Sequence, residues 1–151
     1  MKNHEIIYLK TKELLLEHIP ERIEEHENGW HIVDLDSGFW LSSDDRELTI
    51  GYGFSHIHVD PEYDDLSKAI DVLFNLITCK KRISNYCKGN ICYRAQVDLI
   101  LENEEVYNLG KSATLIFPFW RKTICKTEME DELINIELIK DAMVEIKQLA
   151  R

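Results

Sequence analysis

Apolar residues recur along this chain with two different periods, one typical of helices and one typical of strands. Helical spacing marks the first 28 residues, where Pro20 is expected to break or kink the helix. It returns in an apolar stripe over residues 66–77 and again in a C-terminal helix predicted over 128–150. Between these segments the period falls to two. The pattern therefore predicts three helices separated by groups of strands.

Three strands are predicted before the middle helix and three after it. The first group opens with a hairpin whose turn, Asp36-Ser37-Gly38, has the residue types of a tight turn with one positive φ. In the second group, alternate apolar residues from Tyr93 to Leu101 predict a sheet with one covered face. The segments predicted as strands are 30–35, 39–41, 47–59, 82–87, 91–102 and about 106–119.

Two helix starts are predicted from capping residues. Asp60-Pro61-Glu62 places a capping aspartate before a proline, with Asp64 as a competing cap, and Thr127-Glu128-Met129-Glu130 fits a capping box. The predicted order is α-βββ-α-βββ-α, an α+β fold in which a meandering antiparallel sheet carries helices on one face. We expect a single domain over 1–151, with two possible α-βββ units at about 1–59 and 60–120 and the C-terminal helix over 128–150.

The charge balance narrows the class of partner. The 151 residues include 18 basic and 28 acidic side chains, a formal net charge of −10, which on average repels nucleic acid and permits a basic protein partner. No stretch approaches the ~18 apolar residues of a membrane helix, and the N-terminal segment lacks the features of a signal peptide. We therefore expect a cytoplasmic chain with no nucleic-acid or membrane partner. Because no phosphate loop or dinucleotide motif is present, we expect no cofactor.

The four cysteines are expected to be reduced thiols in that compartment. Cys87 and Cys92 flank a predicted hairpin turn around Gly89, so their thiols could face each other. A structural zinc site needs a second close pair, which Cys79 and Cys125 do not form.

The stretch GYGFSHIHVDPEYDD, residues 51–65, is the candidate for chemistry. Residues at i, i+2 and i+4 of a strand share one face, so His56, His58 and Asp60 could converge on zinc or another divalent ion. The pattern resembles part of the metallo-β-lactamase signature, and His-x-His alone resembles amidohydrolases. Both families are rejected, because no histidine follows His58 and the chain is too short for an amidohydrolase barrel. A small metal-dependent hydrolase built on His31, His56, His58 and Asp60 remains the alternative.

The face that the two histidines occupy depends on how the predicted long strand is built. Apolar residues hold even positions up to Phe54 and odd positions from Ile57. Strict alternation would point the histidines into the core, whereas a β-bulge near Gly51, Gly53 or Ser55 would turn them outward. We favour the bulge because two glycines stand there.

One resemblance bears on function. A tryptophan-led hairpin (Trp30–Leu41), a strand at Leu48-Thr49-Ile50, a His-x-His strand end and an acidic helix start follow one another, and this order resembles small α+β immunity proteins of bacterial polymorphic toxin systems over about residues 28–80. The resemblance implies a cytoplasmic inhibitor that binds a toxin domain, often a basic nuclease, and blocks its active site. A scaffold or subunit without chemistry is a third possibility. The candidate partner contacts are His56, His58, Asp60, Glu62, Asp64 and Asp65.

Overall fold

The computed structural model describes residues 1–114, 116 and 118–151. It confirms the α+β class: three helices accompany two sheets, and every strand pair is antiparallel. The helices are α1 (Asn3–His18), α2 (Leu66–Thr78) and α3 (Ile136–Gln148). The first sheet contains β1 (Ile23–His26), β2 (His31–Asp34), β3 (Phe39–Ser43), β4 (Leu48–Tyr52) and β5 (Ser55–Val59). The second sheet contains β6 (Lys80–Lys88), β7 (Ile91–Ile100), β8 (Val106–Ala113) and β9 (Thr123–Glu130).

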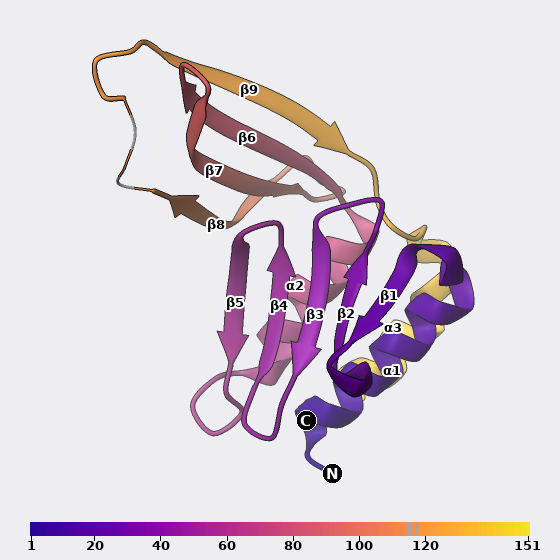
Figure 1. Ribbon diagram of the computed structural model, residues 1–151. Coiled ribbons are helices and arrows are strands. Elements are labelled where there is room, and N and C mark those ends of the chain that lie inside the picture. The colour runs from indigo at the N-terminus through magenta and orange to yellow at the C-terminus, as the bar shows by residue number, and fades with distance from the viewer. Residues whose placement is uncertain (115, 117) are drawn as a thin grey trace.

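The first sheet is a five-stranded meander in the order β1-β2-β3-β4-β5, and the helices lie on one of its sides (Figure 1). In β2 and β3 buried and accessible residues alternate, as in a sheet with one covered face, whereas every residue of β4 is buried. Ile32, Leu41 and Ile50 point toward the helices and are fully buried with Leu15 of α1 and Leu73 of α2. The opposite face is left open by the described residues, and this is where the candidate site lies.

The second sheet, in the order β8-β7-β6-β9, extends beyond the first (Figure 1). Its part next to the helices joins the same core through Val97, Leu99 and Leu109. β9, at the edge of this sheet, is exposed along most of its length. Among the described residues, no helix is long and apolar enough to cross a membrane.

The predicted long strand 47–59 is instead two strands, β4 and β5, joined by a two-residue turn. Tyr52 pairs with Ser55 across the turn, and Gly53 has a φ of +60°, as the first position of a type II′ turn requires. The hairpin, and not a bulge, resets the alternation. Ile57 and Val59 therefore lie on the covered side and the two histidines lie outward, as expected, although the predicted mechanism was wrong.

The helix predicted up to Asn28 ends earlier. α1 stops at His18, Pro20 opens a short 3₁₀ turn (Pro20–Arg22), and β1 follows as the first strand of the meander. Backbone pairing of Ile23–His26 with β2 outweighs the helical spacing of the sequence there. The first group therefore has five strands where three were predicted.

The two predicted helix starts also lie elsewhere. Residues Thr127–Glu130 form the end of β9, because their backbone pairs with β6, and α3 begins at Ile136 with Asn135 as its cap. α2 begins at Leu66 with Asp65 as its cap, while Asp60-Pro61-Glu62 lies in the preceding turn. The last predicted strand, 106–119, ends at Ala113, and its positions 115 and 117 lie outside the described residues.

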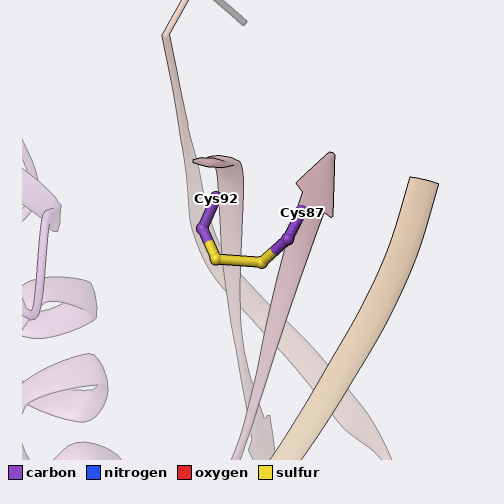
Figure 2. Close-up of a disulfide and its surroundings, with 2 residues drawn as sticks. All are labelled: Cys87 and Cys92. Carbon is purple, nitrogen blue, oxygen red and sulfur yellow. A yellow bond between two sulfur atoms is a disulfide. The ribbon is translucent and has the colours of Figure 1, made fainter. Parts of the chain in front are cut away.

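A disulfide joins Cys87 to Cys92 (Figure 2). The prediction of reduced thiols is therefore wrong for these two residues, while Cys79 and Cys125 are free. The physical reason is the register of the hairpin, which sets Cys87 of β6 directly opposite Cys92 of β7. The bond closes the hairpin at the far end of the second sheet.

Candidate functional site: the open face of the first sheet and its acidic edge

The open face of the first sheet is built from two rows of residues that run across all five strands. Residues directly opposite each other in antiparallel strands share a face, so the register assembles each row. The first row reads His26, His31, Ser42, Thr49 and His58, and the second reads Glu24, Val33, Trp40, Gly51 and His56. Four of the six histidines of the chain thus lie on one face around a single indole.

The rings of this face form a continuous series. The ring centroids are 5.9 Å apart for His26 and His31, 5.6 Å for His31 and Trp40, 5.7 Å for Trp40 and His56, and 4.8 Å for His56 and His58. The indole Nε1 of Trp40 donates a hydrogen bond of 2.9 Å to the carbonyl of Gly53, which holds the indole across β4. Trp40 therefore sits centrally, with two histidines on either side.

Gly51 makes room for that indole. A Cβ atom at position 51 would lie 2.0 Å from Cε2 of Trp40. We expect Gly51→Ala to displace the indole, break its hydrogen bond to Gly53, and lower the free energy of unfolding by about 1–3 kcal/mol through overpacking. Urea unfolding and the indole N–H resonance of Trp40 measure the two effects. Ser42→Ala, on the same face, is the control, and equal behaviour of the two variants would contradict this account of the face.

The edge of the open face at β5 is linked to the acidic loop 60–65 by two contacts. Nδ1 of His58 lies 2.6 Å from Oε1 of Glu47 and 3.2 Å from Oγ1 of Thr49. The neighbour of Glu47, Arg46, places its Nε 3.1 Å from Oδ2 of Asp60. The histidine rows and the acidic loop are therefore one contiguous surface.

Within the loop, most of the acids hold the backbone in place. Asp60 accepts from the backbone N–H of Glu62 at 3.0 Å, and Asp64 accepts from that of Asp60 at 2.8 Å. The bond from Glu62 lowers the pKa of Asp60 most, and Arg46 lowers it further, so Asp60 stays charged. Asp65 caps α2, accepting from Ser67 at 2.9 Å. These three carboxylates therefore shape the loop as well as charging it.

Tyr63 and Glu62 are the side chains that the loop presents. Tyr63 is 81% exposed although it is a large aromatic residue, and Glu62 is exposed beside it. Both border an open concavity of about 710 Å³ whose lining also includes Arg46 and Asp60. An exposed tyrosine ringed by charged groups is typical of a protein-binding surface. Sequence reasoning missed Tyr63, for which the only signal was its place among the acidic residues of 60–65.

The four residues of the metal alternative are on this surface, but they do not converge. Trp40 lies between His31 and His56, and Asp60 is engaged by Arg46. Within residues 1–114, 116 and 118–151, no group of three or more His, Cys, Asp or Glu side chains is arranged to hold a metal ion.

A second polar cluster lies inside the molecule, where the two sheets meet. Lys81 is fully buried. Its Nζ donates a hydrogen bond of 2.8 Å to the carbonyl of Leu76 and lies 5.3 Å from the ring centroid of Tyr52. Tyr52 in turn donates to the carboxylate of Glu130, and burial raises the pKa of Glu130. No periodic signal in the sequence marks Lys81, which stands in the basic run Lys80-Lys81-Arg82.

Comparison of the chain with protein families, with characterised proteins and with solved structures finds no match.

Proposed function

We propose that this chain is a non-catalytic inhibitor of the immunity type, which binds a basic protein domain through the open face of the first sheet and the acidic loop 60–65. The observation that carries the proposal is the contiguity of the two surfaces through His58, Glu47, Arg46 and Asp60. Together they offer exposed aromatic and imidazole rings bordered by negative charge. Aromatic residues are enriched at the centres of protein interfaces, and charged residues at their rims.

The two parts of the surface have different tasks in this proposal. Tyr63 is the anchor that a pocket of the partner takes up, since its ring is already free of the protein core. The carboxylates of the loop speed the encounter with a basic partner and fix its orientation. Because screening by salt weakens long-range attraction, the association rate is expected to fall as the salt concentration rises.

A binding experiment tests the proposal with the product of the neighbouring gene as the probe, which the proposal predicts to contain a basic toxin domain. We expect Tyr63→Ala to raise the Kd at least about tenfold. We expect Glu62→Lys to raise it about five- to tenfold, mostly through a slower association rate. Asp141→Lys makes the same charge change at an exposed position of α3 and is expected to leave the Kd unchanged. Calorimetry gives the Kd, and stopped-flow mixing gives the rates.

Three results would overturn the proposal. The first is that the neighbouring gene product does not bind or is not inhibited. The second is that Asp141→Lys weakens binding as much as Glu62→Lys, which would mean that only net charge matters. The third is stoichiometric zinc in protein purified without a histidine tag, lost in His56→Ala and His58→Ala, which would favour the metal-dependent hydrolase.

A further inference from the structure

The far part of the second sheet has a charge opposite to that of the rest of the chain. We call residues 83–97 and 109–127 the basic arm. These segments contain six basic residues and no acidic residue, which leaves twelve basic and 28 acidic residues in the rest of the chain. In space, the hairpin of β6 and β7 and the start of β9 extend away from the helices and both termini (Figure 1). The basic residues of the arm are Lys88, Arg94, Lys111, Arg121, Lys122 and Lys126.

Large apolar side chains are exposed at the tip of this arm. Ile116, Phe119 and Trp120 are 84%, 76% and 73% exposed. Phe119 and Trp120 pack edge to face with their ring centroids 5.3 Å apart, and Arg121 and Lys122 follow them directly. Leaving such residues in water is unfavourable, so a cluster of them marks a surface that is covered in use.

The tip is held in this arrangement by specific contacts. The backbone N–H of Arg121 donates a hydrogen bond of 3.0 Å to the carbonyl of Pro118, and this bond closes a turn around the aromatic pair. Nζ of Lys88 donates a hydrogen bond of 2.9 Å to the carbonyl of Arg121, which connects the β6–β7 hairpin to this turn. The disulfide between Cys87 and Cys92 closes the same hairpin (Figure 2). Apolar and cationic groups are thus presented together.

We propose that the tip of the basic arm docks on an anionic lipid bilayer. In this arrangement Ile116, Phe119 and Trp120 enter the boundary between headgroups and acyl chains, where tryptophan is favoured, and Arg121 and Lys122 meet the lipid phosphates. The acidic remainder of the chain is repelled by the same surface, which orients the molecule with the arm toward the lipid. We expected no membrane partner because no stretch is long and apolar enough to span a bilayer, but docking on the bilayer surface needs no spanning segment. The proposal is independent of the proposed inhibitor function.

The arm suits lipid better than nucleic acid, although both are polyanions. Binding of single strands uses free aromatic faces on which bases stack. In the arm, the guanidinium of Arg94 lies 4.7 Å from the ring centroid of Tyr86, and Nζ of Lys88 lies 5.9 Å from that of Tyr93, so cations already cover these two rings. The exposed rings of Phe119 and Trp120 pack edge to face against each other. The exposed aliphatic side chain of Ile116 adds nothing to base stacking, whereas it gains from entering lipid.

Vesicle binding tests the proposal on the full chain. We expect it to sediment with vesicles of phosphatidylcholine mixed with phosphatidylglycerol but not with phosphatidylcholine alone, less at high salt, and with a blue shift of tryptophan emission. Arg121→Glu with Lys122→Glu should weaken binding more than about 25-fold, at about fivefold for each cation. Lys68→Glu with Lys140→Glu, at exposed positions of α2 and α3, makes the same charge change and should have a much smaller effect. Trp120→Ala should weaken binding and abolish the blue shift.

Circular dichroism confirms that each variant is folded before its binding is interpreted. Failure of the unchanged chain to bind the mixed vesicles would overturn the proposal, as would equal losses in the two charge-reversed pairs. It would also be overturned by tighter binding to a single-stranded oligonucleotide at the same salt concentration. If a second copy of the chain covered the arm, light scattering would show a dimer that dissociates in the Arg121→Glu, Lys122→Glu variant, and this result too would overturn the proposal.

Discussion

Replacing Arg22 by leucine is expected to lower the free energy of unfolding by about 3 kcal/mol at pH 7, because it leaves a buried carboxylate without its counter-ion. The side chain of Asp34 is fully buried and accepts hydrogen bonds of 2.9 and 2.6 Å from Nε and Nη2 of Arg22. It also accepts from Ser37 and from the backbone N–H of Asp36. Those two donors remain in the variant but do not supply a positive charge. Urea unfolding measures the loss.

The pH dependence of this loss has a definite sign. Burial alone would raise the pKa of Asp34, but the hydrogen bonds from Arg22, Ser37 and Asp36 outweigh it, and the pKa lies below its usual value. A carboxyl whose pKa is lower when folded stabilises the protein above its unfolded pKa, and this contribution disappears as the pH falls through the folded pKa. The difference between the unchanged chain and Arg22→Leu should therefore shrink on acidification.

A control uses an exposed ion pair. Nζ of Lys140 lies 3.2 Å from Oε1 of Glu137 on the surface of α3. Because exposed ion pairs contribute little to stability, Lys140→Leu should leave the free energy of unfolding nearly unchanged at every pH. If Arg22→Leu were no more destabilising than Lys140→Leu, the buried pair would not have the role assigned to it.

The elements that the sequence predicts well are those in which local pattern and tertiary environment agree. The apolar stripe of α2 matches the structure because it buries one face against the core. The alternation in β7 matches it only in part, since Val97 and Leu99 enter the core but Asp98 between them is buried as well. Thr127–Glu130 has the residue types of a capping box, yet the backbone of this segment pairs with β6. Such pairing between segments far apart in the chain has no signal in a short window, so β9 could not be predicted from it.

In the candidate site, too, the features set by local pattern could be predicted and those set by long-range strand pairing could not. The change of parity after Phe54 correctly indicated that His56 and His58 lie outward, because it reports which residues are buried. The two rows across the open face depend on the register of five strands, including β1, and a single sequence does not fix register. The basic arm escaped prediction because net charge was taken over the whole chain.

Lys81→Met is expected to raise the free energy of unfolding at pH 7 by about 1–3 kcal/mol, the largest gain we expect from a single substitution. Burial lowers the pKa of the Lys81 ammonium to about 8. Because this group is fully buried, keeping it charged opposes folding by about 3 kcal/mol. Its hydrogen bond to Leu76 and its contact with the Tyr52 ring offset only part of that cost.

The pH dependence separates this effect from a simple gain in apolar packing. Between about pH 8 and the ordinary lysine value near 10.5, the unfolded chain holds the proton of Lys81 and the folded chain does not. The free energy of unfolding of the unchanged chain should therefore rise with pH over that interval, and the advantage of Lys81→Met should decline. Urea unfolding of both chains from pH 7 to pH 10 gives the difference between their free energies of unfolding. The contributions of other titrating groups are the same in both chains and cancel in this difference. Lys80→Met, at the exposed neighbouring position, should run parallel to the unchanged chain. Parallel curves for Lys81→Met as well would mean that the pKa of Lys81 is not lowered in the folded protein, because water reaches the ammonium group.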